Sequence, residues 1–142
     1  MSDHPPGLEH RWLLDDPYRV VIPTPLPLRL DDLAGRPWVG GQPGTAVELG
    51  LDRVRRASGM ALESEHVCAE FPAVIALVEA GLSAAIVPEL ALPVGAHPGL
   101  QSVALPEFGV RHIGAVVTAS PRPPPLVIEV LAAFTEAAAD SV

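Results

Sequence analysis

Prolines and glycines spread along the whole chain restrict its fold more than any other feature. The 142 residues include seventeen prolines and twelve glycines, and the prolines stand mostly alone between apolar segments. Proline fixes the backbone and lacks an amide donor, so it ends helices and strands. The pattern therefore predicts many short elements in a folded domain and not a disordered tract.

Composition and charge narrow the class of protein. Hydrophobic residues make up 49% of the chain and charged residues 18%, which is enough to bury a core in one domain of this length. Nine arginines against seventeen acidic residues give a net charge of −8. A negative chain does not neutralise phosphates, so this charge disfavours binding to nucleic acid. The longest apolar run, residues 77–92, contains Glu79 and Glu89, so it does not fit a membrane span.

Two features indicate the compartment. The N-terminal segment MSDHPPGLEHRW places acidic residues, histidine and proline where a secretory signal needs a basic start and an apolar stretch. Cys68 is the single cysteine, which excludes an internal disulfide and a multi-cysteine metal site. We expect a cytoplasmic protein without membrane contact and without a cofactor.

The clearest element is a helix over residues 46–58. Thr45 and Glu48 have the spacing of a capping box, and apolar residues recur along one face. Arginines occupy the last turn before Gly59, which suits a left-handed C-terminal cap. Gly50 in the interior of the helix predicts close packing against a neighbour.

The remaining pattern alternates strands with helices. Short β-branched or alternating runs predict strands at 18–23, 37–40, 61–70, 83–88, 100–105 and 111–119. Apolar periodicity predicts helices at 71–81 and 125–140, and a single helical turn at 30–33. This order is typical of an open α/β sheet with right-handed crossovers, which binds ligands at the carboxyl ends of its strands.

The segment GLSAA at 81–85 has part of the pattern of a nucleophile elbow. In that motif the serine follows a strand and precedes a helix, whereas Ser83 follows a predicted helix and precedes a predicted strand. Ala85 also stands where the motif has glycine. We interpret Gly81 as a helix cap and expect no catalytic residue here, so the chain is not predicted to be an enzyme.

The segment EHVCAE places His66, Cys68 and Glu70 on one side of a predicted strand. Neighbours two apart on one strand rarely converge on one ion, and no second cysteine or HExxH motif completes a site. We therefore expect neither a metal nor thiol catalysis. Residues 68–71, at a strand end and a helix start, are instead candidates for lining a pocket. Plain packing and capping is the alternative.

The segment GGQPGTA at 40–46 precedes the clearest helix. Its backbone amides and Thr45 would suit an anion at a helix N-terminus. It is not a P-loop, because the chain has neither GxxxxGK nor any lysine. A simple glycine–proline turn with a threonine cap is equally compatible with these residues.

Four segments in order resemble the effector-binding domain of LysR-type transcriptional regulators. They are LLDDPYRVVIPTPLPL, LRLDDLAGRPWV, RRASGMAL and LVEAGLSAAIVP, and the match runs from about Trp12 to the C-terminus. The resemblance implies part of a periplasmic-binding-protein type II architecture of two α/β subdomains. Residues 1–11 would form an N-terminal tail, 24–114 subdomain II, and 115–142 the return crossover and C-terminal helix.

The resemblance implies a function as the effector-sensing and oligomerisation part of a regulator. A small molecule would bind in a cleft between the subdomains, and copies of the domain would pair antiparallel through the helix at 46–58. Effector contacts would come from Gly41, Gln42, Thr45, Cys68, Ala69, Glu70 and Phe71. The hinge would include Val21, Ile22, Pro23, Thr24, Val116 and Val117. Glu70 would penalise an anionic effector, so the charge preference stays open.

The chain also departs from the family pattern. Ser83 replaces a family glycine, and TPLPL replaces a histidine–proline step. The winged helix-turn-helix and the first half of subdomain I have no counterpart in these residues, as in a fragment or a shortened gene product, so DNA contact would need a helix-turn-helix outside this chain. The alternatives are an assembly or dimerisation module without a working ligand site, and a small hydrolase.

Overall fold

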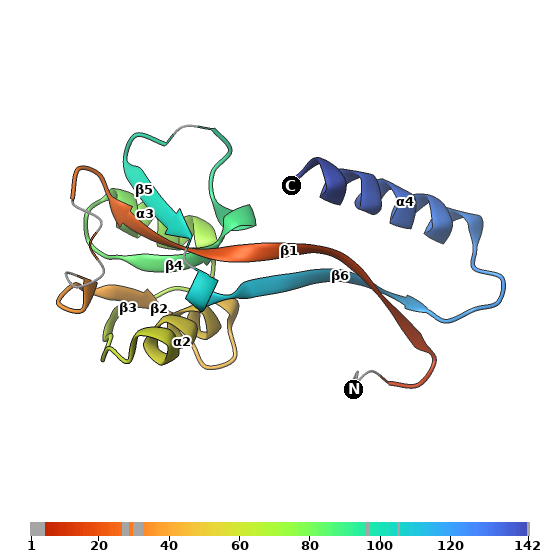
Figure 1. Ribbon diagram of the computed structural model, residues 1–142, viewed down its shortest axis with the longest axis horizontal. Helices are drawn as coiled ribbons and strands as arrows, with labels where there is room; N and C mark the ends of the chain where they lie inside the picture. Colours follow the sequence, from red (N-terminus) through yellow and green to blue (C-terminus); the bar gives the residue numbers. More distant parts are fainter. Residues whose placement is uncertain (1–4, 27–28, 30–32, 96, 105, 142) are drawn as a thin grey trace. The chain divides into compact units, whose positions relative to one another are not determined.

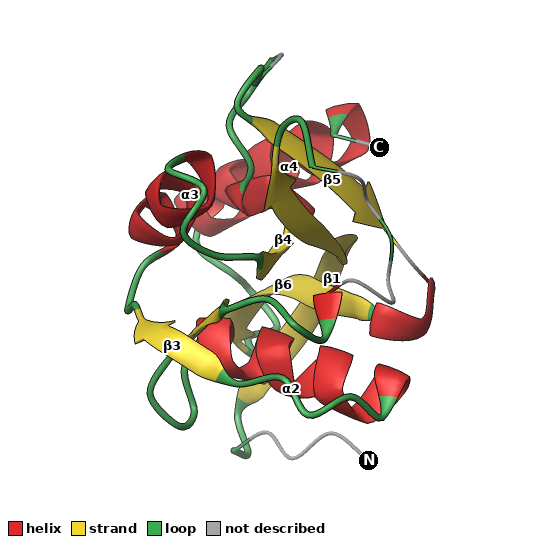
Figure 2. Cartoon of the chain, turned by 90° about the vertical axis from the view of Figure 1, so that its left-hand side faces the viewer, coloured by secondary structure: helices red, strands yellow, loops and turns green. Residues whose placement is uncertain are grey.

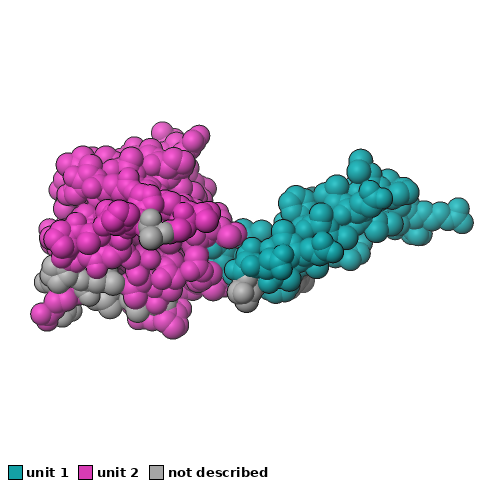
Figure 3. Space-filling view, turned by 90° about the horizontal axis from the view of Figure 1, so that it is seen from above, with its two compact units in different colours: residues 1–16, 112–142 teal, residues 17–111 magenta. Residues whose placement is uncertain are grey.

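The computed structural model describes residues 5–26, 29, 33–95, 97–104 and 106–141. The α/β class predicted from the sequence is confirmed (Figure 1). The chain divides into two compact units, coloured separately in Figure 3. Unit 1 consists of residues 1–16 and 112–142, and unit 2 of residues 17–111. Among the described residues, no helix has both the length and the hydropathy to cross a membrane.

Strand β1 (Leu8–Pro23) organises the sheet. It pairs antiparallel with β4 (Ala85–Pro88) on one edge and with β5 (Leu100–Ala104) on the other. Strand β6 (Val110–Thr118) also pairs with β1. The antiparallel pairs depart from the open crossover sheet expected from element order, because order along the chain does not determine strand direction.

The sequence pattern predicted a strand that begins at Tyr18, but β1 begins at Leu8. Its first five residues are exposed and mix apolar with charged side chains without regular alternation, so their hydropathy does not indicate a strand. They are extended because they pair with β6. Just beyond the ends of the two strands, the amide of Ala119 donates to the carbonyl of Gly7 at 2.8 Å. Residues 8–11, predicted as an N-terminal tail, therefore lie in a strand.

A parallel arrangement is present elsewhere in unit 2. β2 (Trp38–Gly40) pairs parallel with β3 (Ser64–Val67), and Trp38 forms an isolated parallel bridge with Ala84, just before β4. The crossover connections that the sequence predicted are thus confined to β2, β3 and the approach to β4. β3 is shorter than predicted and ends before Cys68.

The helices agree closely with the sequence predictions. α2 (Ala46–Ser58) and α4 (Pro125–Asp140) have the predicted bounds. α3 (Phe71–Glu79) ends shortly before Gly81, whose φ of 75° suits a residue without a side chain. Two short 3₁₀ helices follow, η1 (Glu89–Ala91) and η2 (Pro106–Phe108). The turn predicted at 30–33 lies largely outside the described residues.

Two clusters of buried side chains form the core, both within unit 2. Alternate residues of β1 point to opposite faces: Val20 joins the cluster containing Leu51 of α2, and Val21 joins the cluster containing Val74 of α3. Figure 2 shows α2 and α3 on opposite sides of these strands. The two helices thus cover the two faces of the sheet.

Gly50 confirms the predicted close approach of α2. A Cβ atom at this position would lie 3.1 Å from Cγ2 of Ile86 and 3.4 Å from a ring carbon of Tyr18. Arg53, one turn further on, stacks its guanidinium 4.9 Å from the centre of the Tyr18 ring. The helix is thereby held directly against β1 and β4.

Candidate functional site

The carboxyl ends of β2 and β3 lie side by side, because the two strands are parallel. Gly40 is aligned with Val67, and the amide of Cys68 donates to the carbonyl of Gly40 at 3.0 Å. Each strand leads through a short loop into a helix: residues 41–45 into α2 and residues 68–70 into α3. We call these loops, together with Phe71, the edge site. All seven predicted effector contacts belong to these two loops and Phe71, and their role stays a prediction.

The first loop of the edge site is held by its own hydrogen bonds. The hydroxyl of Thr45 donates to the carbonyl of Gln42 at 2.7 Å and accepts from the amide of Glu48 at 3.4 Å. The amide of Gly41 donates to Oε2 of Glu48 at 2.9 Å. The predicted capping box is therefore half formed, because Glu48 binds the Gly41 amide, whereas the Thr45 amide donates to Gln42.

Glu48 connects this loop to the last turn of α2. Its Oε1 atom accepts from Arg55 at 2.8 Å, and Arg55 also binds Asp52 at 3.0 Å. Partial burial by itself lowers the pKa of Arg55, but the hydrogen bonds to these two carboxylates outweigh it and raise the pKa above its ordinary value. The sequence indicated Glu48 as a cap, but not as the residue that joins Gly41 to Arg55.

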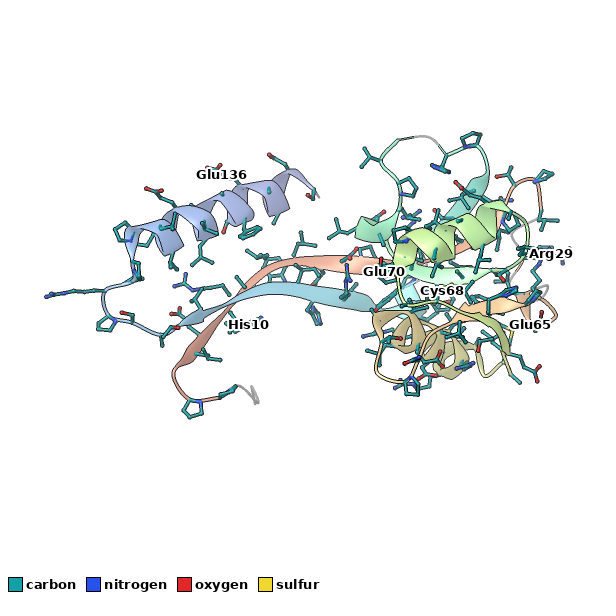
Figure 4. All side chains as sticks on the ribbon, turned by 180° about the vertical axis from the view of Figure 1, so that it is seen from behind. His10, Arg29, Glu65, Cys68, Glu70 and Glu136 are labelled. Carbon is teal, nitrogen blue, oxygen red and sulfur yellow. The ribbon has the colours of Figure 1, made fainter. Side chains whose placement is uncertain are left out.

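The second loop combines buried and exposed side chains. Cys68 and Phe71 are half-buried and pack against the core cluster beneath α3, whereas Ala69 and Glu70 are exposed. Glu70 is the N-cap residue of α3, and its carboxylate makes no capping hydrogen bond. Figure 4 shows Glu70 at the start of α3 with Cys68 just before it.

The three potential ligands of EHVCAE do not share one strand face. β3 ends at Val67, so His66 lies in the strand while Cys68 and Glu70 lie in the loop that follows. Within the part of the chain that the structure describes, no group of three or more His, Cys, Asp or Glu side chains is placed to hold a metal ion.

Ser83 lies between α3 and β4, which is the order that the sequence predicted. Its side chain is buried, with 4% exposure, and its hydroxyl has no hydrogen-bond partner among the described residues. It precedes a strand and follows the C-terminal end of a helix. The position therefore lacks the helix N-terminal amides that a nucleophile elbow supplies.

The predicted hinge residues fall in different units. Val21, Ile22 and Pro23 lie within β1, aligned with β5, and Thr24 follows them in unit 2. Val116 and Val117 lie in the part of β6 that belongs to unit 1. The chain divides between residues 16 and 17 and between 111 and 112. The hinge assignment, like the proposed subdomain bounds, stays a prediction.

A separate cavity of about 150 Å³ lies beside β1 and β5 in unit 2. It is lined by Val21, Leu92, Pro93, Gly95, His97, Leu100, Gln101 and Ser102. His97, one of these lining residues, approaches Glu79 of α3, with 2.5 Å between Nδ1 and Oε1. None of the predicted effector contacts lines this cavity.

One family of known proteins matches nearly the whole chain. The family described as "LysR substrate binding domain" matches residues 1–139. The chain belongs to this family. The match begins at the first residue, so it includes the segment before Trp12 that the sequence patterns left out. Proteins of the LysR substrate-binding family bind small-molecule effectors within LysR regulators.

Solved structures of LysR regulators share the fold. The Synechocystis PCC6803 CcmR regulatory domain, in complex with 2-PG, has a TM-score of 0.76 and 15% identity; the match covers 97% of this chain and 71% of that one. The QuiR effector-binding domain with shikimate has a TM-score of 0.69 and 17% identity, over 95% and 66% of the two chains. A Corynebacterium glutamicum OxyR mutant has a TM-score of 0.69 and 22% identity, over 99% and 46%.

These likenesses confirm the periplasmic-binding-protein type II-like fold that the sequence resemblance implied. The chain spans about half the length of the full-length regulators it matches, with 51% for CbnR and 50% for BenM. A search of curated proteins found no significant match to the sequence.

Proposed function

We propose that this chain is the effector-sensing part of a LysR-type transcriptional regulator and that the edge site contacts a small-molecule effector. The observation that carries the proposal is the convergence of the loops after β2 and β3, joined by the bond from Cys68 to Gly40. Ligands of open α/β sheets bind at the carboxyl ends of strands, next to helix N-termini. The family to which the chain belongs binds small-molecule effectors, which supports a ligand site in this domain.

The proposal extends to how the signal is used. An effector that binds one arrangement of the domain better than another shifts the population between them, and this changes the assembly that contacts DNA. DNA binding would come from a helix-turn-helix outside these residues, and the protein would act in the cytoplasm. The net charge of −8 fits a chain that does not itself bind nucleic acid.

A thermal-shift panel of organic acids, amino acids, amines and aromatics, with shikimate included, tests the proposal. A compound at about a hundred times its Kd should raise the Tm by about 10 °C. The substitution Ala69→Trp, at an exposed position of the edge site, should abolish this shift. The matched control Ala57→Trp, exposed in the last turn of α2, should keep it. A flat panel, or equal shifts in both variants, would contradict the proposal.

Assembly is a second candidate function, favoured by the apolar surface of unit 1. In α4, Leu126 is 68% exposed, Ile128 53% and Phe134 54%, and large exposed apolar surfaces mark interaction sites. The pairing through α2 implied by family resemblance stays a prediction, and on that helix the exposed large hydrophobic residue is Leu49.

Light scattering of the purified chain separates the two functions. If α4 mediates self-association, Leu126→Ser combined with Phe134→Ser should convert a dimer into a monomer. The control Glu129→Ala lies on the same helix and should leave the dimer intact. A dimer that survives the double substitution would contradict an assembly role for α4, and it would leave the effector proposal unaffected.

A further inference from the structure

We infer that the effector carries a positively charged nitrogen, an amine or guanidinium group, that pairs with Glu70 at the edge site. The inference rests on the proposed function, because it names the ligand class of the same site. It follows from the charges at the edge site and from the backbone amides there that already have acceptors.

The start of α2 is already occupied by a carboxylate of the chain itself. Anions usually bind helix N-termini through free amides, but the amide of Gly41 donates to Glu48 at 2.9 Å and the amide of Glu48 donates to Thr45 at 3.4 Å. The Thr45 hydroxyl donates its proton to Gln42. An anionic effector here would compete for these donors and would be repelled by Glu48.

The start of α3 also disfavours an anion. Pro72 has no amide proton, and the amide of Val74 donates to the carbonyl of Glu70 at 3.3 Å. The carboxylate of Glu70 is exposed and makes no capping bond. The N-terminus of α3 therefore has fewer amide donors for an anion than other helices, and it carries the negative charge of Glu70.

Two arginines of unit 2, Arg55 and Arg19, are committed to carboxylates. Arg55 binds Glu48 and Asp52, and Arg19 binds Glu89, just after β4, at 2.7 Å. The remaining arginines of unit 2 lie elsewhere: Arg29 and Arg36 precede β2, Arg53 and Arg56 lie in the C-terminal half of α2, and Arg111 lies in β6 and is itself engaged. Figure 4 shows Arg29 at the opposite end of unit 2 from Glu70.

The neighbours of Glu70 suit a cation. Phe71 is half-buried beside it, and the face of an aromatic ring attracts ammonium and guanidinium groups. Gln42 is exposed on the other loop and can accept a hydrogen bond through its side-chain carbonyl. One carboxylate, one ring and one amide oxygen together match a ligand that donates N–H bonds and carries positive charge.

The test uses matched probes that differ only in charge. Putrescine, 1,4-butanediol and succinate form one series, and benzylamine, benzyl alcohol and benzoate form another. Each is titrated into the wild-type chain while amide NMR shifts are followed at residues 41–45 and 68–71. We expect the amines to shift these amides and the carboxylates to leave them unchanged. Glu70→Gln should weaken amine binding about five- to tenfold, whereas Glu65→Gln, at the other end of unit 2 (Figure 4), should not.

The outcomes separate the charge inference from the proposed function. Carboxylates that shift the edge-site amides while amines do not would overturn the inference and leave the proposed function standing. Amine binding that Glu70→Gln does not weaken would also overturn the inference. If no probe moves these amides, the charge inference fails, whereas the proposed function fails only if the thermal-shift panel is flat as well.

Discussion

Unit 2 and unit 1 are built from similar elements but differ in what their side chains bury. Both core clusters belong to unit 2. Among the described residues of unit 1, Ala138 is the one buried hydrophobic residue. A space of about 340 Å³, lined by apolar residues such as Val117, Leu131 and Phe134, lies between β6 and α4. Unit 1 thus has the elements of a layered fold without a filled core.

The buried clusters make unit 2 the rigid part on which a binding site can be built. A binding site must be held by packed elements if its groups are to keep their geometry. The edge site stands on β2, β3, α2 and α3, which all contribute to the buried clusters or pair with strands that do. The exposed apolar side chains of unit 1 suit contacts with another surface.

The largest expected effect contrasts core truncation in the two units. Leu51→Ala removes a fully buried side chain of α2 and should lower the free energy of unfolding by about 2–5 kcal/mol. Leu126→Ala removes a side chain that is 68% exposed in α4 and should change it by less than about 0.5 kcal/mol. Urea denaturation measures both. Equal losses in the free energy of unfolding would mean that the side chains of unit 1 form a core, contrary to their exposure.

A smaller effect is expected where the two parallel strands meet. A Cβ atom at Gly40 would lie 2.7 Å from Cβ of Ser64 and 2.8 Å from Oε2 of Glu48. Gly40→Ala should therefore destabilise the chain by about 1–3 kcal/mol and disturb the edge site. Gly35→Ala is the control, because nothing lies within 4 Å of a Cβ atom there. A neutral Gly40→Ala in thermal unfolding would show that β2 and β3 are less tightly packed.

Helix caps give the next contrast. Thr45→Ala removes the side-chain cap of α2 and should cost about 1 kcal/mol. Thr45→Ser should restore most of the loss, because serine offers the same oxygen. Thr135→Ala in α4 removes only a hydroxyl that donates to the carbonyl of Leu131 at 2.8 Å, and it should be close to neutral. Chemical denaturation measures the free energy of unfolding of the three variants. Equal values for Thr45→Ala and Thr135→Ala would contradict a stabilising cap at Thr45.

The smallest effect concerns a surface cluster of unit 1. Hydrogen bonds from Trp12 and then from His112 lower the pKa of Asp15 below its ordinary value. Because the pKa of Asp15 is lowered in the folded chain, its ionised carboxylate stabilises the fold at pH values above the ordinary pKa. This stabilisation is lost as the pH falls through the lowered pKa. NMR titration of the Asp15 carboxyl should show this, and His112→Ala should move the pKa back toward its ordinary value. An unchanged pKa would contradict the pairing.

The sequence predicted elements whose signals are local. The helix at 46–58 carries its own cap at Thr45 and its own stop at Gly59, so its bounds needed no information from the rest of the chain. The convergence of the two loops of the edge site was also predictable in outline, because the family resemblance named residues after two strands. That these strands are parallel and adjacent supplies the geometry.

The parts that sequence reasoning missed depend on distant partners. The first half of β1 is extended because of β6, about a hundred residues later in the chain. Glu48 accepts from the amide of Gly41, seven residues earlier, whereas the amide of Thr45 donates to the carbonyl of Gln42. Neither contact has a signature within a window of a few residues, so only the folded chain reveals them.

Hydrogen exchange of backbone amides, with and without a stabilising compound from the thermal-shift panel, shows which unit binds the effector. We expect slower exchange at residues 41–45 and 68–74 of unit 2 and unchanged exchange along α4 of unit 1. Slowed exchange confined to α4 and β6, with the edge site unaffected, would show that the ligand binds the apolar surface of unit 1 and would contradict the account.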